Sequence, residues 1–172
     1  MALTLGTWRA VTPRVGLQPI TATSATALHP VGTIILARDA GTTAYGEGEF
    51  VYCKGVASVV EKDWCVIPSD NFVAVRAVAN SIGPVGVAMA AITASFYGWF
   101  QINGKALGKC LTQFADNGYV YLTATAGSID DASVAGDWIS GAVGASTAVV
   151  GDLHAEFELS RPFAGQRVSV IG

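Results

Sequence analysis

Charged side chains are scarce in this sequence. Lysine and arginine together number 10 and aspartate and glutamate 13, so only 13% of the 172 residues are charged, against ~25% in a typical soluble domain. The basic residues form no cluster and the net charge is −3, which argues against nucleic-acid binding by neutralisation of phosphates. A chain with so few charges either contacts partners over a large area or lies in a membrane.

Cysteines are also few, and their spacing excludes the usual cysteine-based frameworks. The three are Cys53, Cys65 and Cys110. An odd number at these spacings fits neither a disulfide scaffold nor a zinc site. We interpret them as buried, reduced thiols, which fits folding in a reducing cytosol. The first ten residues lack an apolar stretch of signal-peptide length, so export by that route is not expected.

A continuous apolar stretch able to form a membrane helix is missing as well. Residues 77–104 carry no charge, which would suit a membrane segment. However, Gly83-Pro84 interrupts them, and polar residues such as Asn80 and Thr93 divide the remainder. Two strands joined by a loop explain the stretch better than a helix. We therefore expect no membrane contact.

No constellation of catalytic or metal-ligating residues emerges. His154 and Glu156 are two residues apart on an expected strand, so both face the same way; they form either an acid–base pair or an exposed strand face, and we favour the second. Asp130-Asp131 lacks the further spaced oxygen ligands of a calcium loop. Gly98–Lys105 departs from the phosphate-loop pattern, because Ala106 replaces the Ser or Thr that binds magnesium. We expect no enzymatic activity, cofactor or metal.

What the sequence does contain is a succession of short β-strand patterns. β-Branched and aromatic segments recur at about the 8–12-residue spacing of an all-β sandwich or barrel. In Tyr97–Ile102, alternation sends Trp99 and Phe100 to opposite faces, so at least one of them should lie in the core. Asn103-Gly104 follows, a dipeptide typical of hairpin turns. The expected fold class is all-β, a compact antiparallel β-barrel or sandwich formed by residues 47–172.

The last strand that the sequence predicts is His154–Leu159. Its residues alternate strictly, with Ala155, Phe157 and Leu159 on one face and polar residues on the other, as in an antiparallel strand with one exposed face. Pro162 is expected to end it, because proline cannot donate a hydrogen bond to the neighbouring strand.

Residues 1–46 have a different composition, rich in Thr, Ala, Gly and Pro. We interpret them as an extended N-terminal arm with one short apolar strand at Thr33–Ala37, because proline favours extended backbone. Such an arm either adds a strand to the open edge of a neighbouring protein or folds back and completes its own barrel; we favour the first. The residues that we expect at the partner interface are Trp8, Arg9, Arg14, Ile34, Ile35, Leu36 and Arg38.

Several segments together resemble the head decoration, or cement, proteins of tailed bacteriophages. The resemblance covers roughly residues 47–159. It implies a compact β-barrel attached to the outer surface of a capsid, made in the host cytoplasm, with the major capsid protein and neighbouring copies of itself as partners. The matching segments are Gly48–Ser58, Gly83–Ala88, Tyr97–Ala106, Tyr119–Gly127 and Ala135–Asp137.

The sequence is compatible with two functions. The first is a virion structural protein that decorates and stabilises a phage capsid by binding the major capsid protein. The second is a host- or carbohydrate-binding fibre or spike module, for which the four tryptophans and five tyrosines are the favourable feature. The number of copies in the virion separates them, because decoration needs hundreds of copies and a fibre only a few.

Overall fold

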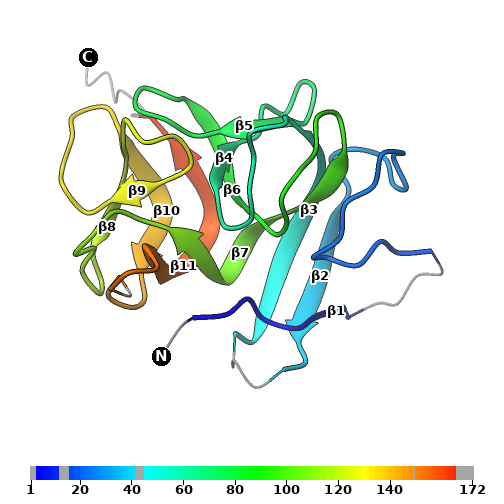
Figure 1. Cartoon of the computed structure of the whole chain (residues 1–172), viewed down its shortest axis with the longest axis horizontal. Coiled ribbons are helices and arrows are strands. Elements are labelled where there is room, and N and C mark those ends of the chain that lie inside the picture. The colour runs from blue at the N-terminus through cyan, green and yellow to red at the C-terminus, as the bar shows by residue number, and fades with distance from the viewer. Residues whose placement is uncertain (1–2, 12–15, 42–44, 149, 166–172) are drawn as a thin grey trace, which may run out of the picture.

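The computed structural model describes residues 3–11, 16–41, 45–148 and 150–165. These residues form strands and loops and contain no helix (Figure 1), so none with the length and hydrophobicity needed to cross a membrane. The predicted all-β fold class is confirmed. The strands described are β1 (Trp8–Ala10), β2 (Ile34–Asp39), β3 (Glu47–Gly55), β4 (Trp64–Val66), β5 (Val73–Arg76), β6 (Gly83–Ala88), β7 (Tyr97–Lys109), β8 (Tyr119–Leu122), β9 (Ile129–Asp130), β10 (Trp138–Gly144) and β11 (His154–Ala164).

The strands form one sheet that partly closes on itself. Their order is β1-β2-β3-β5-β4-β6-β7-β11-β10-β8-β9, and the additional pairing of β3 with β7 joins β3, β5, β4, β6 and β7 into a ring. The pairing between β3 and β5 is parallel, whereas the other named strand pairs are antiparallel. The structure is consistent with the predicted β-barrel or sandwich, but this one parallel contact makes the sheet mixed and not purely antiparallel.

The ring encloses a core to which all five of its strands contribute. Val51 and Cys53 come from β3, and Phe100 from β7, and all three are buried. Trp99, the residue before Phe100, is buried in a separate cluster on the other side of β7. The predicted division of Trp99 and Phe100 between two faces is confirmed, and both faces are packed.

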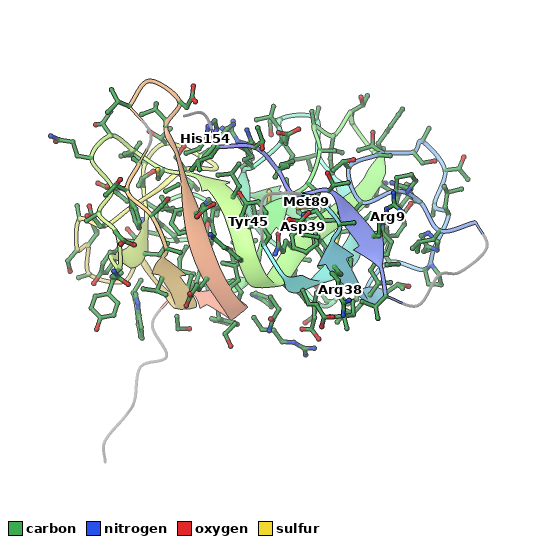
Figure 2. The ribbon with its side chains drawn as sticks, turned by 90° about the horizontal axis from the view of Figure 1, so that it is seen from below. Arg9, Arg38, Asp39, Tyr45, Met89 and His154 are labelled. Carbon is green, nitrogen blue, oxygen red and sulfur yellow. The ribbon has the colours of Figure 1, made fainter. Side chains whose placement is uncertain are left out.

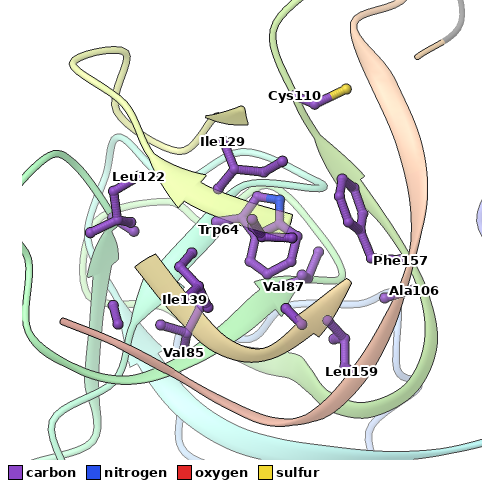
Figure 3. Close-up of a cluster of buried hydrophobic side chains, with 14 of the residues drawn as sticks. Trp64, Val85, Val87, Ala106, Cys110, Leu122, Ile129, Ile139, Phe157 and Leu159 are labelled. Atoms are coloured by element: carbon purple, nitrogen blue, oxygen red, sulfur yellow. The ribbon is translucent and has the colours of Figure 1, made fainter. Parts of the chain in front are cut away.

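A second and larger core lies between β4, β6 and β7 and the strands β8 to β11. Trp64 of β4 is fully buried at its centre (Figure 3) and packs edge to face on Phe157 of β11, with ring centroids 4.9 Å apart. Phe114 also packs on Phe157, with ring centroids 5.1 Å apart. Such perpendicular aromatic pairs add ~0.5–1.5 kcal/mol to the stabilisation from burial itself.

Asn103-Gly104 does not form the predicted hairpin. It lies inside β7, which runs unbroken from Tyr97 to Lys109. Gly104 has a φ of 86°, and the register between β3 and β7 shifts beside it, between Glu49 and Phe50. The residue passed over at this shift is Ile102. Gly104 itself is paired with Leu159 of β11, so its positive φ is accommodated inside a continuous strand, as a glycine allows.

The prediction that Pro162 ends the last strand is also wrong. β11 continues through Pro162 to Ala164. Its register with β10 shifts between Ser140 and Ala142, so that Phe163 pairs with Ser140 beyond the shift. A proline is tolerated at such a bulge, because the ladder bond that it cannot make is already interrupted there.

The described part of residues 1–46 folds back on the barrel. Ile20 and Ala37 are buried, 4% and 0% exposed, in one cluster with Trp99 and Tyr52. The indole Nε1 of Trp99 donates a hydrogen bond to the backbone carbonyl of Gln18 at 3.1 Å. The hydroxyl of Tyr52 donates to the side-chain oxygen of the same Gln18 at 2.8 Å. An apolar segment with few charges is stabilised by leaving water, and the nearest apolar surface belongs to its own chain.

The strand expected to pair with a neighbour is therefore used within the chain. Ile34, Ile35 and Leu36 lie in β2, and β2 pairs with β3 from Ile34–Val51 to Arg38–Glu47. On its other side β1 pairs with residues 37–39 of β2. Our favoured hypothesis, in which this strand extends a partner's sheet, is wrong for the described structure, and the fold-back alternative describes it.

Candidate partner-binding surface

The outer face of β1 and β2 carries a strip of exposed apolar side chains. Along β2, Ile34 and Leu36 lie on the face opposite to that of buried Ala37, and they are 47% and 43% exposed. Val11 follows β1, donates its backbone N–H to Leu36 at 3.0 Å, and is 44% exposed. Three neighbouring aliphatic side chains thus face solvent at one end of the sheet. We call Val11, Ile34 and Leu36 the apolar strip.

The apolar strip leads into a groove. Ile34 forms part of its wall together with Val51, its partner on β3. The groove has a volume of about 390 Å³, and its surface is mostly apolar. Chain segments far apart in sequence meet in its walls, which are lined by Ile34, Val51, Ile67, Ser69, Phe72, Pro84, Val85, Ile102, Arg161, Pro162 and Phe163.

Ion pairs border the strip and the groove. Arg38 Nη2 lies 2.6 Å from Glu47 Oε1, across β2 and β3. Arg161 binds Glu49 through two nitrogens, each 3.0 Å from a carboxylate oxygen, and this contact raises the pKa of the Arg161 guanidinium. Exposed pairs of this kind contribute little to the stability of the fold. Their arrangement around apolar surface resembles the polar rim of a protein interface.

Arg9 adds a positive charge at the edge of this surface. It lies opposite Arg38 in the register of β1 and β2, and Figure 2 shows the two side by side on these strands. Like charges directly opposite each other repel. Arg38 has Glu47 as a counter-ion, whereas no ion pair involves Arg9 within the described part of the chain. A carboxylate supplied by a partner would relieve the repulsion.

The structure brings together four of the seven predicted interface residues. Arg9, Ile34, Leu36 and Arg38 share the exposed face described above. Arg14 lies outside the described residues.

The other two predicted residues face the opposite way. Trp8 packs on Phe50, with ring centroids 4.9 Å apart, and on Tyr45 at 6.2 Å. Ile35 packs against the same cluster of buried side chains. Both therefore support the fold and present little surface to a partner.

The groove could not be predicted from the sequence, because its residues come from separate strands and loops. Alternation along β7 could have marked Ile102 as lying on the same face as Phe100. No local signal connects Phe72, Ile102 and Phe163, because only the pairing of β3 with β5 and β7, and of β7 with β11, brings their segments together.

The pairs of polar residues considered for chemistry are engaged in other contacts. Glu156 Oε2 lies 2.6 Å from Lys105 Nζ. Burial, and then the charges of Lys62 and Lys109, lower the pKa of His154. Asp131 accepts a hydrogen bond from the backbone of Ala115 at 2.9 Å. Within the described residues no group of three or more His, Cys, Asp or Glu side chains is arranged to hold a metal ion.

Comparisons of the chain with protein-family models, with curated proteins and with solved structures find no match.

Proposed function

We propose that this chain is a virion structural protein that decorates the outer surface of a phage capsid and stabilises it by binding the major capsid protein. The observation that carries the proposal is the apolar strip of Val11, Leu36 and Ile34, which continues into the apolar groove beside it. The resemblance of residues 47–159 to head decoration proteins supports the choice of partner.

Physical chemistry supports protein binding at this surface. A contiguous apolar patch on a folded protein is stabilised when a partner covers it, and such patches mark interaction sites. The ion pairs Arg38–Glu47 and Arg161–Glu49 provide a polar border, as protein interfaces commonly have. A specific interface buries ~1,600 Å² in total, and many copies on one lattice, in contact with their neighbours, add avidity.

The scarcity of charge is consistent with this proposal. With 13% charged residues, the free chain has little to keep apolar surface in water, and covering that surface on a capsid removes it from solvent. Stabilisation of the capsid would follow if each copy contacts more than one capsid subunit, because separating the subunits would then expose this surface again.

The test is binding to capsids prepared without this protein. The variant Ile34→Ser/Leu36→Ser changes two exposed side chains and should remain folded. We expect its occupancy on capsids to fall at least tenfold, since each lost apolar contact removes about 1 kcal/mol or more and 1.4 kcal/mol is a factor of ten. The matched control is Val134→Ser, which alters a side chain of similar exposure, 47%, and should bind like the wild type.

Two results would contradict the proposal. One is wild-type occupancy of the Ile34→Ser/Leu36→Ser variant. The other is a virion that contains only a few copies of the chain, which would favour the fibre or spike alternative.

A further inference from the structure

A second exposed surface lies at the other end of the molecule. Figure 1 places β8, β9 and β10 at the left and β1 and β2 at the right. On β8 the buried residues Val120 and Leu122 alternate with outward-facing Tyr119, which is 67% exposed. On β10 Trp138 is 42% exposed and lies opposite Tyr121 of β8.

These two aromatic side chains line one hollow. Its volume is about 380 Å³, within the range of small-molecule sites, ~300–1,000 Å³. β11 contributes the carboxylate of Glu158 and the hydroxyl of Ser160, both on exposed residues. Gly141, whose φ is 73°, forms the bulge of β10 at this point, and an added Cβ would lie 2.6 Å from the backbone oxygen of Ser160.

The charges at the hollow restrict its ligand. Glu158 is the one charged residue among those that line it, and no ion pair in the described chain involves it. Lys105 is its cross-strand neighbour on β7, but the Lys105 ammonium lies 2.6 Å from Glu156 instead. A phosphate, a nucleic acid or an acidic sugar would meet a carboxylate without a neighbouring free cation, and is disfavoured.

The remaining chemistry fits a sugar. A pyranose ring has apolar C–H faces, which contact aromatic rings favourably, and hydroxyl groups around its edge. Tyrosine and tryptophan offer an apolar ring together with a polar group. The carboxylate of Glu158 accepts hydrogen bonds from hydroxyls, and bonds to a charged acceptor are the stronger kind. The Ser160 hydroxyl can both donate and accept.

We propose that Tyr119, Trp138, Glu158 and Ser160 form a binding site for a neutral saccharide, separate from the capsid-binding surface. This site does not depend on the proposed function, since its aromatic residues lie on β8 and β10, which line neither the apolar strip nor the groove; the two surfaces share only β11. A capsid-bound protein that docks through β1 and β2 would keep β8 and β10 available to a glycan on a cell surface.

The experiment applies the purified full chain to an array of neutral oligosaccharides built from glucose, mannose, galactose and N-acetylglucosamine. Sialylated and sulphated oligosaccharides are included on the same array. We expect retention on neutral sugars. Tyr119→Ala and Trp138→Ala should each lower it by about tenfold, the loss of one favourable aromatic contact. Glu158→Gln should weaken it by a smaller factor.

The matched control is Val60→Ser, which changes another exposed side chain, 40% exposed, and should leave retention unchanged. If Trp138→Ala does not fold, sugar retention is measured with Tyr119→Ala and with the more conservative Trp138→Phe in its place. The proposal is overturned if the wild-type protein retains no neutral sugar. It is also overturned if both alanine variants bind neutral sugars as well as the wild type does. Preference for acidic sugars would overturn it too.

A change of capsid occupancy or of oligomeric state in these variants, without sugar binding by the wild type, would identify the face as a protein contact and also overturn it.

Discussion

The carboxylate of Asp63 lies 2.6 Å from the ammonium of Lys109, although the Asp63 side chain is completely buried. Its other oxygen lies 3.0 Å from Nε of Arg76 and accepts a hydrogen bond from the backbone of Val60 at 2.8 Å. Two cations and a backbone donor thus compensate one buried charge. The arrangement joins the start of β4 to the ends of β5 and β7.

Removing this charge should destabilise the protein. We expect Asp63→Asn to lower the free energy of unfolding by about 3–5 kcal/mol, since breaking one side of a buried ionic contact leaves the partners uncompensated. Denaturant titration measures this. Glu61→Gln is the control, because Glu61 pairs with Lys62 at 3.5 Å and is 48% exposed; its cost should stay below ~1 kcal/mol. Equal effects of both changes would contradict the argument.

Truncation of either large side chain in the middle of β7 should be costly. Trp99 and Phe100 are 1% and 0% exposed and belong to different cores. We expect Trp99→Ala and Phe100→Ala each to cost about 3–5 kcal/mol, measured by thermal or chemical unfolding. Tyr119→Ala, at an exposed position, should cost less than ~0.5 kcal/mol. Wild-type melting temperatures for both core variants would contradict the burial of Trp99 and Phe100 in two packed cores.

Gly104 should not tolerate a side chain. Its φ is 86°, and an added Cβ would lie 2.3 Å from the backbone oxygen of Glu47. Gly46 is a matched control, with a φ of 74° and no atom within 4 Å of the added Cβ. We expect Gly46→Ala to cost about 1 kcal/mol for the backbone conformation alone, and Gly104→Ala clearly more. Comparable melting temperatures for the two variants would be the contrary result.

The cysteine thiols should be unreactive in the folded protein. Burial raises the pKa of Cys53 to about 12 and, with the nearby Asp130 and Asp131, that of Cys110 to about 12. At pH 8 we expect slow reaction with a thiol reagent in the native state and rapid reaction of all three cysteines after denaturation, because the thiolate is the nucleophile.

The same shifts determine how stability depends on pH. A thiol with a raised pKa in the folded state stays protonated there while the unfolded chain ionises. Its contribution to stability is complete below the unfolded pKa, ~8.5, and is lost as the pH rises toward about 12. The free energy of unfolding should therefore fall across this window. A Cys53→Ala/Cys110→Ala variant should show a shallower fall, and an unchanged slope would contradict the assignment.

Deleting the N-terminal segment should damage the fold. A chain that starts at Gly46 lacks β1, β2 and the buried side chain of Ile20, and it uncovers Trp99 and Tyr52. We expect loss of cooperative unfolding or aggregation, seen by circular dichroism and size-exclusion chromatography. The milder Ile20→Ala should cost about 2–5 kcal/mol. A soluble truncated protein with wild-type stability would show that the segment does not support the barrel.

Local patterns in the sequence were sufficient for the fold class and for several strands. Alternation at Trp99 and Phe100, and at Ala155, Phe157 and Leu159, depends on the two-residue period of a strand, which needs no knowledge of the neighbours. The same residues then supply both sides of the packed core. The interpretation of the cysteines as buried thiols is likewise confirmed, because apolar neighbours in sequence often share their burial.

Other features depended on which strands pair, and no local pattern encodes that. Asn103-Gly104 is typical of a hairpin turn, but the pairing of β7 with β3 and with β11 keeps both residues inside one continuous strand.

The sequence by itself determined that the chain is all-β, poor in charge and built from short strands along which apolar residues alternate. Only the tertiary structure decided that β2 pairs with β3, that Ile34 and Leu36 face solvent while Ile35 packs inward, and that Ile34, Ile102 and Phe163 line one groove. The physical reason is that side-chain alternation is a property of a single strand, whereas a binding surface arises where strands distant in sequence come together to bury the rest of their apolar area.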